Sequence, residues 1–282
     1  MFRFLFASIS LLITFFLVSP GAGAQFFYKD IWTNQQLTKE FAILKNENIR
    51  TVSVKSFEDD GEPSEGFFLE RKIDRNFTKS ETVSRSYITQ QSLLVSFYND
   101  KGWIIKTADS TQTSLARSDY EYDNKGRVTQ ITTFTKANDE KGGIIETHQY
   151  VYNAAGKPEK MIRRKNNADL STVNFTTDDK GNVIEEEEIA KGVKGRKYLY
   201  YYDDKNRLTD VVHFHPRAKR LLPDYMYEYN QLNQVKQMIS TDDNASNYHI
   251  WRYTYNEQRL RDTEKCYSKE KRLLGSIRYE YK

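Results

Sequence analysis

The stretch that decides the fold reads Tyr120-Glu121-Tyr122-Asp123-Asn124-Lys125-Gly126. Successive side chains of a strand point to opposite faces, so Tyr120 and Tyr122 share one face. The side chain of Asp123 can accept hydrogen bonds from backbone N–H groups two residues further on, and Gly126 tolerates a positive φ. The stretch therefore predicts a strand that ends in a tight hairpin, formed by a type I turn and closed by a left-handed residue.

This phrase recurs along the chain in seven copies, and an eighth copy begins at Tyr279. The copies are anchored on Asn99, Asp123, Asn153, Asp178, Asp203, Asn230 and Asn256, which lie 24 to 30 residues apart. Six copies carry Gly or Asn at the left-handed position, whereas the copy with Glu257 and Gln258 lacks such a residue and is expected to turn differently. A regular period of this length indicates repeated hairpins that bury their apolar faces only against neighbouring hairpins.

Two sets of residues within the repeats are candidates for a role. The tyrosines that form pairs are Tyr120 and Tyr122, Tyr150 and Tyr152, Tyr200 and Tyr202, Tyr227 and Tyr229, and Tyr253 and Tyr255. The residues predicted to form the turns are Asp123, Gly126, Asn153, Gly156, Asp178, Gly181, Asp203 and Asn206. Rows of tyrosines usually pack across strands, and a second interpretation makes them an aromatic surface that binds sugars. After the turn, apolar residues spaced by three, such as Val128, Ile131 and Phe134, indicate a bulged strand or a short helical turn.

The segments 120–129 and 202–209 resemble the YD repeat of RHS and teneurin-type proteins, and the similarity extends from Ser96 to Lys282. In that family the repeats form a continuous antiparallel sheet, which in long members spirals into a shell around a cargo. This chain shows no recognisable toxin, protease or plug segment, so small exported bacterial proteins with few repeats are a closer comparison. We therefore expect an all-β fold, an extended curved antiparallel sheet of tandem β-hairpins with a short N-terminal capping helix.

The composition agrees with a strand-rich globular protein. The chain has 282 residues, 43 Lys and Arg against 39 Asp and Glu, and a mean hydropathy of −0.78. Hydrophobic residues make up 38% of the chain, which excludes a polytopic membrane protein and a thick core. The 20 Tyr and 16 Phe exceed what disordered chains carry and favour strands.

The first 24 residues have the pattern of a signal peptide. An apolar run from Phe4 to Val18 is followed by Ser19-Pro20-Gly21 and by the small residues Ala22-Gly23-Ala24, so cleavage is expected after Ala24. An uncleaved signal anchor is the alternative. We expect an exported protein, periplasmic or extracellular, with no transmembrane segment after cleavage. Its single cysteine, Cys266, excludes an intramolecular disulfide and is expected to be a small buried hydrophobe.

Residues 25–95 differ from the repeat sheet of residues 96–282. Leu37, Phe41 and Leu44 have helical spacing after the candidate N-cap Asn34, which predicts a helix over residues 34–45. Strands are predicted at 50–57, 66–73, 80–88 and 93–98, with an acidic turn at 58–65. We interpret these strands as degenerate hairpins capped by the helix, because the end of a repeat sheet needs cover. No linker separates the two parts, so one continuous domain is expected.

The sequence offers little catalytic chemistry. His213 and His215 share a strand face and could hold two metal ligands, but His148 and His249 lie in distant copies and no third ligand is local. Motifs for nucleophilic, phosphate-binding and zinc-dependent chemistry are absent, and the run Glu185–Glu188 is interpreted as a solvated edge. We expect no enzyme activity, no metal and no cofactor.

The basic stretches 160–165 and 217–220 could contact phosphate or an anionic glycan, whereas nucleic acid is not expected as the partner of an exported chain. The first functional interpretation is a non-enzymatic binding or structural module of the bacterial cell envelope, with an unknown envelope protein as its partner. The alternative is a protein that binds carbohydrate or an envelope polysaccharide through the tyrosine rows and basic stretches. A third interpretation is an accessory of an RHS-type delivery system.

Overall fold

The computed structural model describes residues 26–87, 89–215, 218–241 and 247–282. The signal peptide predicted at residues 1–24 lies outside this part of the chain. The described residues form one helix, α1 (Tyr28–Asn46), and eighteen strands. The strands are β1 (Thr51–Glu58), β2 (Phe68–Ile73), β3 (Lys79–Arg85), β4 (Ser92–Tyr98), β5 (Ile104–Ser110), β6 (Ser114–Tyr122), β7 (Val128–Ala137), β8 (Ile144–Tyr152), β9 (Pro158–Lys165), β10 (Ala168–Thr177), β11 (Val183–Ala190), β12 (Val193–Tyr202), β13 (Leu208–His215), β14 (Arg220–Tyr229), β15 (Val235–Thr241), β16 (Tyr248–Tyr255), β17 (Arg261–Ser268) and β18 (Leu273–Tyr281).

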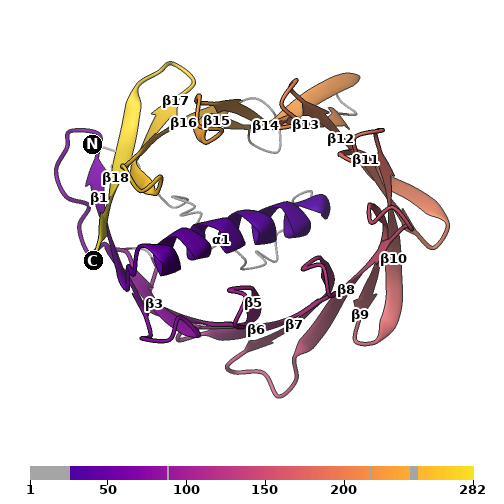
Figure 1. Cartoon of the computed structure of the whole chain (residues 1–282), viewed down its shortest axis with the longest axis horizontal. Helices are drawn as coiled ribbons and strands as arrows, with labels where there is room; N and C mark the ends of the chain where they lie inside the picture. Colours follow the sequence, from indigo (N-terminus) through magenta and orange to yellow (C-terminus); the bar gives the residue numbers. More distant parts are fainter. Residues whose placement is uncertain (1–25, 88, 216–217, 242–246) are drawn as a thin grey trace.

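These strands form a closed antiparallel barrel. Each strand pairs with the next one along the chain, and β1 also pairs with β18, from Val52 opposite Tyr281 to Glu58 opposite Gly275. Figure 1 shows the resulting ring. The expected open curved sheet is therefore wrong. Closure pairs the edges that an open sheet would leave free, and it depends on contacts between segments more than 200 residues apart, which the local repeat phrase does not encode.

The helix lies inside the ring and does not cap a sheet end, which corrects the second part of the expected fold (Figure 1). It begins six residues before the predicted Asn34, which is buried within α1 and not at its N-cap. Phe27 and Ile31 near its start pack in one core cluster, and Phe41 and Leu44 near its end pack in a second. Residues from most of the barrel thus pack in the two clusters that contain the helix.

The turns of the repeats follow the predicted chemistry. The N–H of Gly126 donates to the carbonyl of Asp123 over 3.1 Å, and Gly126 has a φ of +80°. The turn at Asn256 is built in the same way, with Arg259 at a φ of +65° and its N–H 3.0 Å from the carbonyl of Asn256. The expectation that this seventh copy turns differently is wrong. In every repeat hairpin the register of the two strands shifts just before the turn, as between Glu121 and Tyr122. The spacing by three of the apolar residues after the turn, such as Val128 and Ile131, therefore reflects a β-bulge.

These turns lie side by side at one end of the barrel, which we call the rim. The side chain after each left-handed residue reaches the next turn along the rim. Trp103 lies against Gly126, Arg127 lies against Gly156, and the ammonium of Lys157 donates to the carbonyl of Lys180 over 3.2 Å. Further hydrogen bonds of this kind run from the side chain of Asn182 to that of Asn206 (3.3 Å), from Arg207 to the side chain of Asn233 (2.9 Å), and from Gln234 to the carbonyl of Arg259 (3.0 Å). A small or polar residue at the left-handed position therefore closes its own turn and also leaves room for, or bonds, the side chain that reaches it from the preceding turn.

Candidate functional site

The tyrosines singled out in the sequence lie on the inner face of the barrel. Tyr150, Tyr200, Tyr227 and Tyr253 are buried. Tyr120, Tyr122, Tyr152, Tyr202, Tyr229 and Tyr255 are partly buried and pack against the core clusters. Burial raises the pKa of the Tyr122 hydroxyl to about 12. The rows thus form the lining of the lumen, and a ligand on the outside of the barrel does not meet their rings.

The second tyrosine of each pair has a bonding role that the sequence did not reveal. The hydroxyl of Tyr152 donates to the carbonyl of Val128 over 2.7 Å. Val128 is the first residue of β7 and pairs with Tyr122 of β6, and it precedes the first residue pair of the β7–β8 ladder, Gln130 opposite Gln149. Equivalent bonds run from Tyr122 to Ile104, Tyr202 to Val183, Tyr229 to Leu208, Tyr255 to Val235 and Tyr281 to Arg261. Each of these hydroxyls thus donates to the carbonyl of the first residue of a strand and gives that buried polar group a hydrogen-bond partner.

The N-terminal end of α1 is anchored on Glu186 of β11. Its two carboxylate oxygens accept hydrogen bonds from the backbone N–H groups of Phe27 and Tyr28, each over 2.8 Å. A carboxylate at this position satisfies orphan N–H groups and interacts favourably with the helix dipole. Glu186 is only 2% exposed, and this burial raises its pKa to about 7 despite the two N–H bonds. The interpretation of Glu185–Glu188 as a solvated edge is therefore wrong for Glu186, which faces inward.

A second contact at this end joins α1 to β8 and β9. Nδ1 of His148 lies 2.7 Å from Oδ2 of Asp30, and Nε2 lies 2.9 Å from Oε1 of Glu146. Glu146 in turn accepts hydrogen bonds from Nε and Nη2 of Arg163 over 2.8 and 3.2 Å. The hydroxyl of Tyr150 also donates to Oδ2 of Asp30 over 2.7 Å. We call Asp30, Glu146, His148, Arg163 and Glu186 the anchor cluster.

The anchor cluster controls the protonation of its members. Burial acts to lower the pKa of His148, but hydrogen bonds to Asp30 and Glu146 outweigh it and raise the pKa to about 9. Burial acts to raise the pKa of Glu146, but His148 and Arg163 outweigh it and lower the pKa to about 2. At neutral pH His148 is therefore cationic and Glu146 is anionic, so the cluster holds the helix by charge-assisted hydrogen bonds.

The C-terminal half of α1 is held by different chemistry. The ring of Phe41 stacks on that of Tyr98, with centroids 3.7 Å apart and planes 8° from parallel. The buried guanidinium of Arg71 lies 3.4 Å from Glu40 and donates to the hydroxyl of Tyr98 over 2.7 Å. Between the two ends, Asn34 donates to the hydroxyl of Tyr122 over 2.8 Å. The helix is thus attached to the wall along its length.

The remaining predicted candidates do not come together. His213 is buried against Asp224, with 2.7 Å between Nδ1 and Oδ2, while His148 belongs to the anchor cluster. Among the described residues, no group of three His, Cys, Asp or Glu side chains has the geometry of a metal site.

Cys266 is buried, as expected, and burial raises the pKa of its thiol to about 12. Of the basic stretch 160–165, Arg163 belongs to the anchor cluster and Arg164 pairs with Asp169 on the neighbouring strand.

The outer wall has two kinds of surface. Cross-strand ion pairs cover much of it, such as Lys55 with Glu280, Lys106 with Asp119 and Lys197 with Glu185. On β12, β13 and β14, however, large exposed apolar side chains gather. They are Tyr201, Phe214, Leu221 and Met226, which we call the outer patch. Phe214 and Leu221, 53% and 46% exposed, stand opposite each other, and Asp210 is paired with both Tyr201 and Met226.

In the described part of the chain, α1 lacks the long apolar run that a membrane-crossing helix requires.

No protein-family model matches the sequence, and no curated protein matches it. Solved structures show distant likenesses. A porin-like protein from Bacteroides uniformis is 10% identical with a TM-score of 0.38, over 83% of this chain and 98% of that chain. The Photorhabdus luminescens Tc holotoxin pore is 9% identical with a TM-score of 0.30, over 77% of this chain. This chain spans only 15% of that toxin chain.

Proposed function

We propose that the protein is a non-enzymatic exported module of the bacterial cell envelope that binds a partner protein through the outer patch. The observation that carries this proposal is the position of α1. The helix occupies the interior of the barrel (Figure 1). The tyrosine rows pack in the same interior, so the surfaces left for a macromolecular partner are the outer wall and the two ends of the barrel.

The outer patch has the character of an interface core. Aromatic residues and Met are enriched at such cores. The patch supplies Tyr201, Phe214, Leu221 and Met226 on three adjacent strands. By contrast, the wall around β1 and β18 carries the Lys55–Glu280 ion pair, as expected for a surface that remains in water.

The alternative, in which the tyrosine rows bind polysaccharide, requires the helix to leave. The ring of Trp32 on α1 lies 5.6 Å from that of Tyr227, and the ring of Tyr28 lies 5.3 Å from that of Tyr200. A sugar on these tyrosines would have to replace both contacts and break the hydrogen bonds to Glu186. The protein-binding interpretation needs no such rearrangement and is the one we retain.

The proposal is tested by crosslinking tagged protein in its native envelope and identifying the bound protein and polysaccharide. The variant with Phe214→Ser and Leu221→Ser is compared with a matched control that carries Leu115→Ser and Ile145→Ser, two exposed apolar residues elsewhere on the wall. We expect one dominant protein, lost with the first pair of substitutions and kept with the second. Recovery of polysaccharide alone, or equal loss in both variants, would overturn the proposal.

A further inference from the structure

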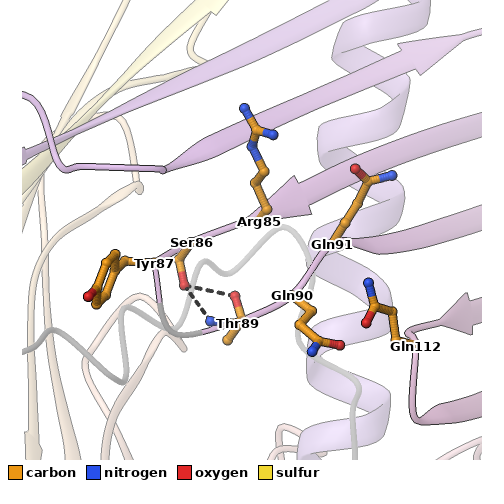
Figure 2. A pocket seen from close by; sticks show the side chains of 7 residues that line it. All are labelled: Arg85, Ser86, Tyr87, Thr89, Gln90, Gln91 and Gln112. Atoms are coloured by element: carbon orange, nitrogen blue, oxygen red, sulfur yellow. Dashed lines mark hydrogen bonds between the residues drawn. The ribbon is translucent and has the colours of Figure 1, made fainter.

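The wall of the barrel is complete without α1. Every described strand is hydrogen-bonded to a neighbouring strand on each side, including the closing pair β1 and β18. In the β3–β4 connection, beside an open hollow on the surface, the hydroxyl of Ser86 accepts the N–H of Thr89 over 3.0 Å (Figure 2). Among the described residues, no backbone–backbone hydrogen bond joins a strand to α1. Departure of the helix would therefore break no hydrogen bond of the sheet.

The face that α1 buries is half polar. Six of the nineteen residues of the helix are buried, and three of them are Asp30, Thr33 and Asn34. The hydroxyl of Thr33 has no hydrogen-bond partner among the described residues, although Thr33 is only 5% exposed. Burial of an unpartnered hydroxyl costs free energy, which is regained when the group meets water. Gln35 and Gln36 are exposed, so water already reaches α1 inside the barrel.

The connection between α1 and the wall has an exposed part and a fixed part. It consists of residues 47–50, of which Glu47 and Asn48 are exposed. The N–H of Arg50 donates to the carbonyl of Lys282 over 2.7 Å, which fixes the end of the connection on the wall. Exposed residues at the end of an element are where hinges lie, because they can change φ and ψ without disturbing a core. The helix can therefore turn about Glu47 and Asn48 as one unit.

We propose that α1 is a displaceable plug, which leaves the interior as a unit while the wall stays closed and then returns to the same place. The anchor cluster and the stack of Phe41 on Tyr98 make the inserted form the resting form. In the displaced form, the inner wall presents tyrosines that α1 otherwise covers, such as Tyr200 and Tyr227. The outer patch lies on the other side of the wall, so partner binding there does not depend on this movement.

Labelling of single thiols in the folded protein tests whether α1 moves without the wall. Cys266 on β17 is 4% exposed and packs in a cluster that contains no described residue of α1, so its labelling by an aromatic disulfide reagent reports opening of the wall. In a second protein, Cys266→Ser removes this thiol and Thr33→Cys places one on the buried face of α1. Each labelling rate is divided by the rate of the same thiol in the unfolded protein.

We expect the relative labelling rate at position 33 to be at least about tenfold higher than at Cys266. We also expect it to depend less on urea below the unfolding transition, because displacement of one helix exposes less surface than opening of the wall. Equal rates with the same urea dependence, or slower labelling at position 33, would overturn the proposal, since α1 would then leave only when the barrel unfolds.

Hydrogen exchange of the unmodified protein, followed by mass spectrometry, gives a test that does not depend on the folding of any variant. Peptides from residues 28–46 of α1 are compared with peptides from residues 261–268 of β17. We expect the amides of α1 to exchange well before those of β17, because displacement is a local opening. Exchange of both segments at the same time would overturn the displaceable plug.

Discussion

Nδ1 of His148 on β8 lies 2.7 Å from Oδ2 of Asp30 on α1, and this contact joins the helix to the wall of the barrel. The chain of contacts continues through Glu146 to Arg163 on β9. Asp30 and Glu146 stabilise the protonated ring of His148, and His148 and Arg163 stabilise the ionised carboxylate of Glu146. The attachment of α1 is therefore linked to pH, and the direction of the effect differs among the groups.

His148→Gln should destabilise the barrel most at mildly acidic pH. The pKa of His148 is raised from 6.5 to about 9, so the protonated ring contributes stability that is fully present below pH 6.5 and is lost as pH rises through about 9. Such a shift corresponds to a contribution on the order of 3 kcal/mol. Thermal unfolding should show a large loss in Tm at pH 6 and a smaller loss at pH 10. A loss of the same size at both pH values would contradict the charged contact.

Glu186→Gln should show a pH dependence through a separate group. The pKa of Glu186 is raised from 4.5 to about 7, so its contribution is fully present below pH 4.5 and is lost as pH rises through about 7. The difference in Tm between the wild-type protein and the variant should therefore decrease as the pH is raised from 5 to 8. A difference that grows over this range would mean that the ionised carboxylate, and not its burial, dominates at the helix N-terminus.

Gly126→Ala should destabilise the protein by about 1–3 kcal/mol. Gly126 has a φ of +80°, and a Cβ there would lie 2.5 Å from Cζ2 of Trp103. Gly142→Ala is the matched control, because a Cβ at Gly142 meets nothing within 4 Å and its φ is not positive. Urea unfolding of the two variants measures the difference. Equal stability of the two would show that the rim contact does not constrain the turn.

Tyr152→Phe should cost about 1 kcal/mol, because it leaves the carbonyl of Val128 without its hydrogen bond while the ring remains. Tyr201→Phe removes a hydroxyl from the exposed outer wall and should leave the free energy of unfolding unchanged. The comparison isolates the hydroxyl from the packing of the ring. Identical unfolding curves for both variants would assign the tyrosine rows to packing alone.

The hairpins could be predicted from the sequence because their determinants are local. Asp123 and Gly126 lie three residues apart and form the turn by themselves. The positive φ of Arg259 was not predicted because arginine rarely takes this conformation, and here the hydrogen bonds of Asn256 impose it. Closure of the barrel was not predicted either, since the pairing of Val52 with Tyr281 is determined by the curvature summed over all strands.

The inner and outer faces were harder to assign than the strands. The run Glu185–Glu188 gives no local sign of which carboxylate faces inward, and only the contacts with the helix N-terminus explain why Glu186 does. Likewise, Asp30 and His148 are separated by 118 residues, and no local signal links them. A polar helix with an aspartate near its start, ahead of a chain rich in paired tyrosines, is the sequence signal that could have suggested an internal helix.

A photo-crosslinking amino acid placed at single positions of the outer wall tests the central claim most directly, with crosslinking carried out in the native envelope. One variant carries this amino acid in place of Phe214, in the outer patch, and a second carries it in place of Leu115, elsewhere on the wall. We predict one dominant protein adduct from position 214 and none from position 115. The same adducts from both positions, or none from position 214, would contradict the outer patch as the binding surface.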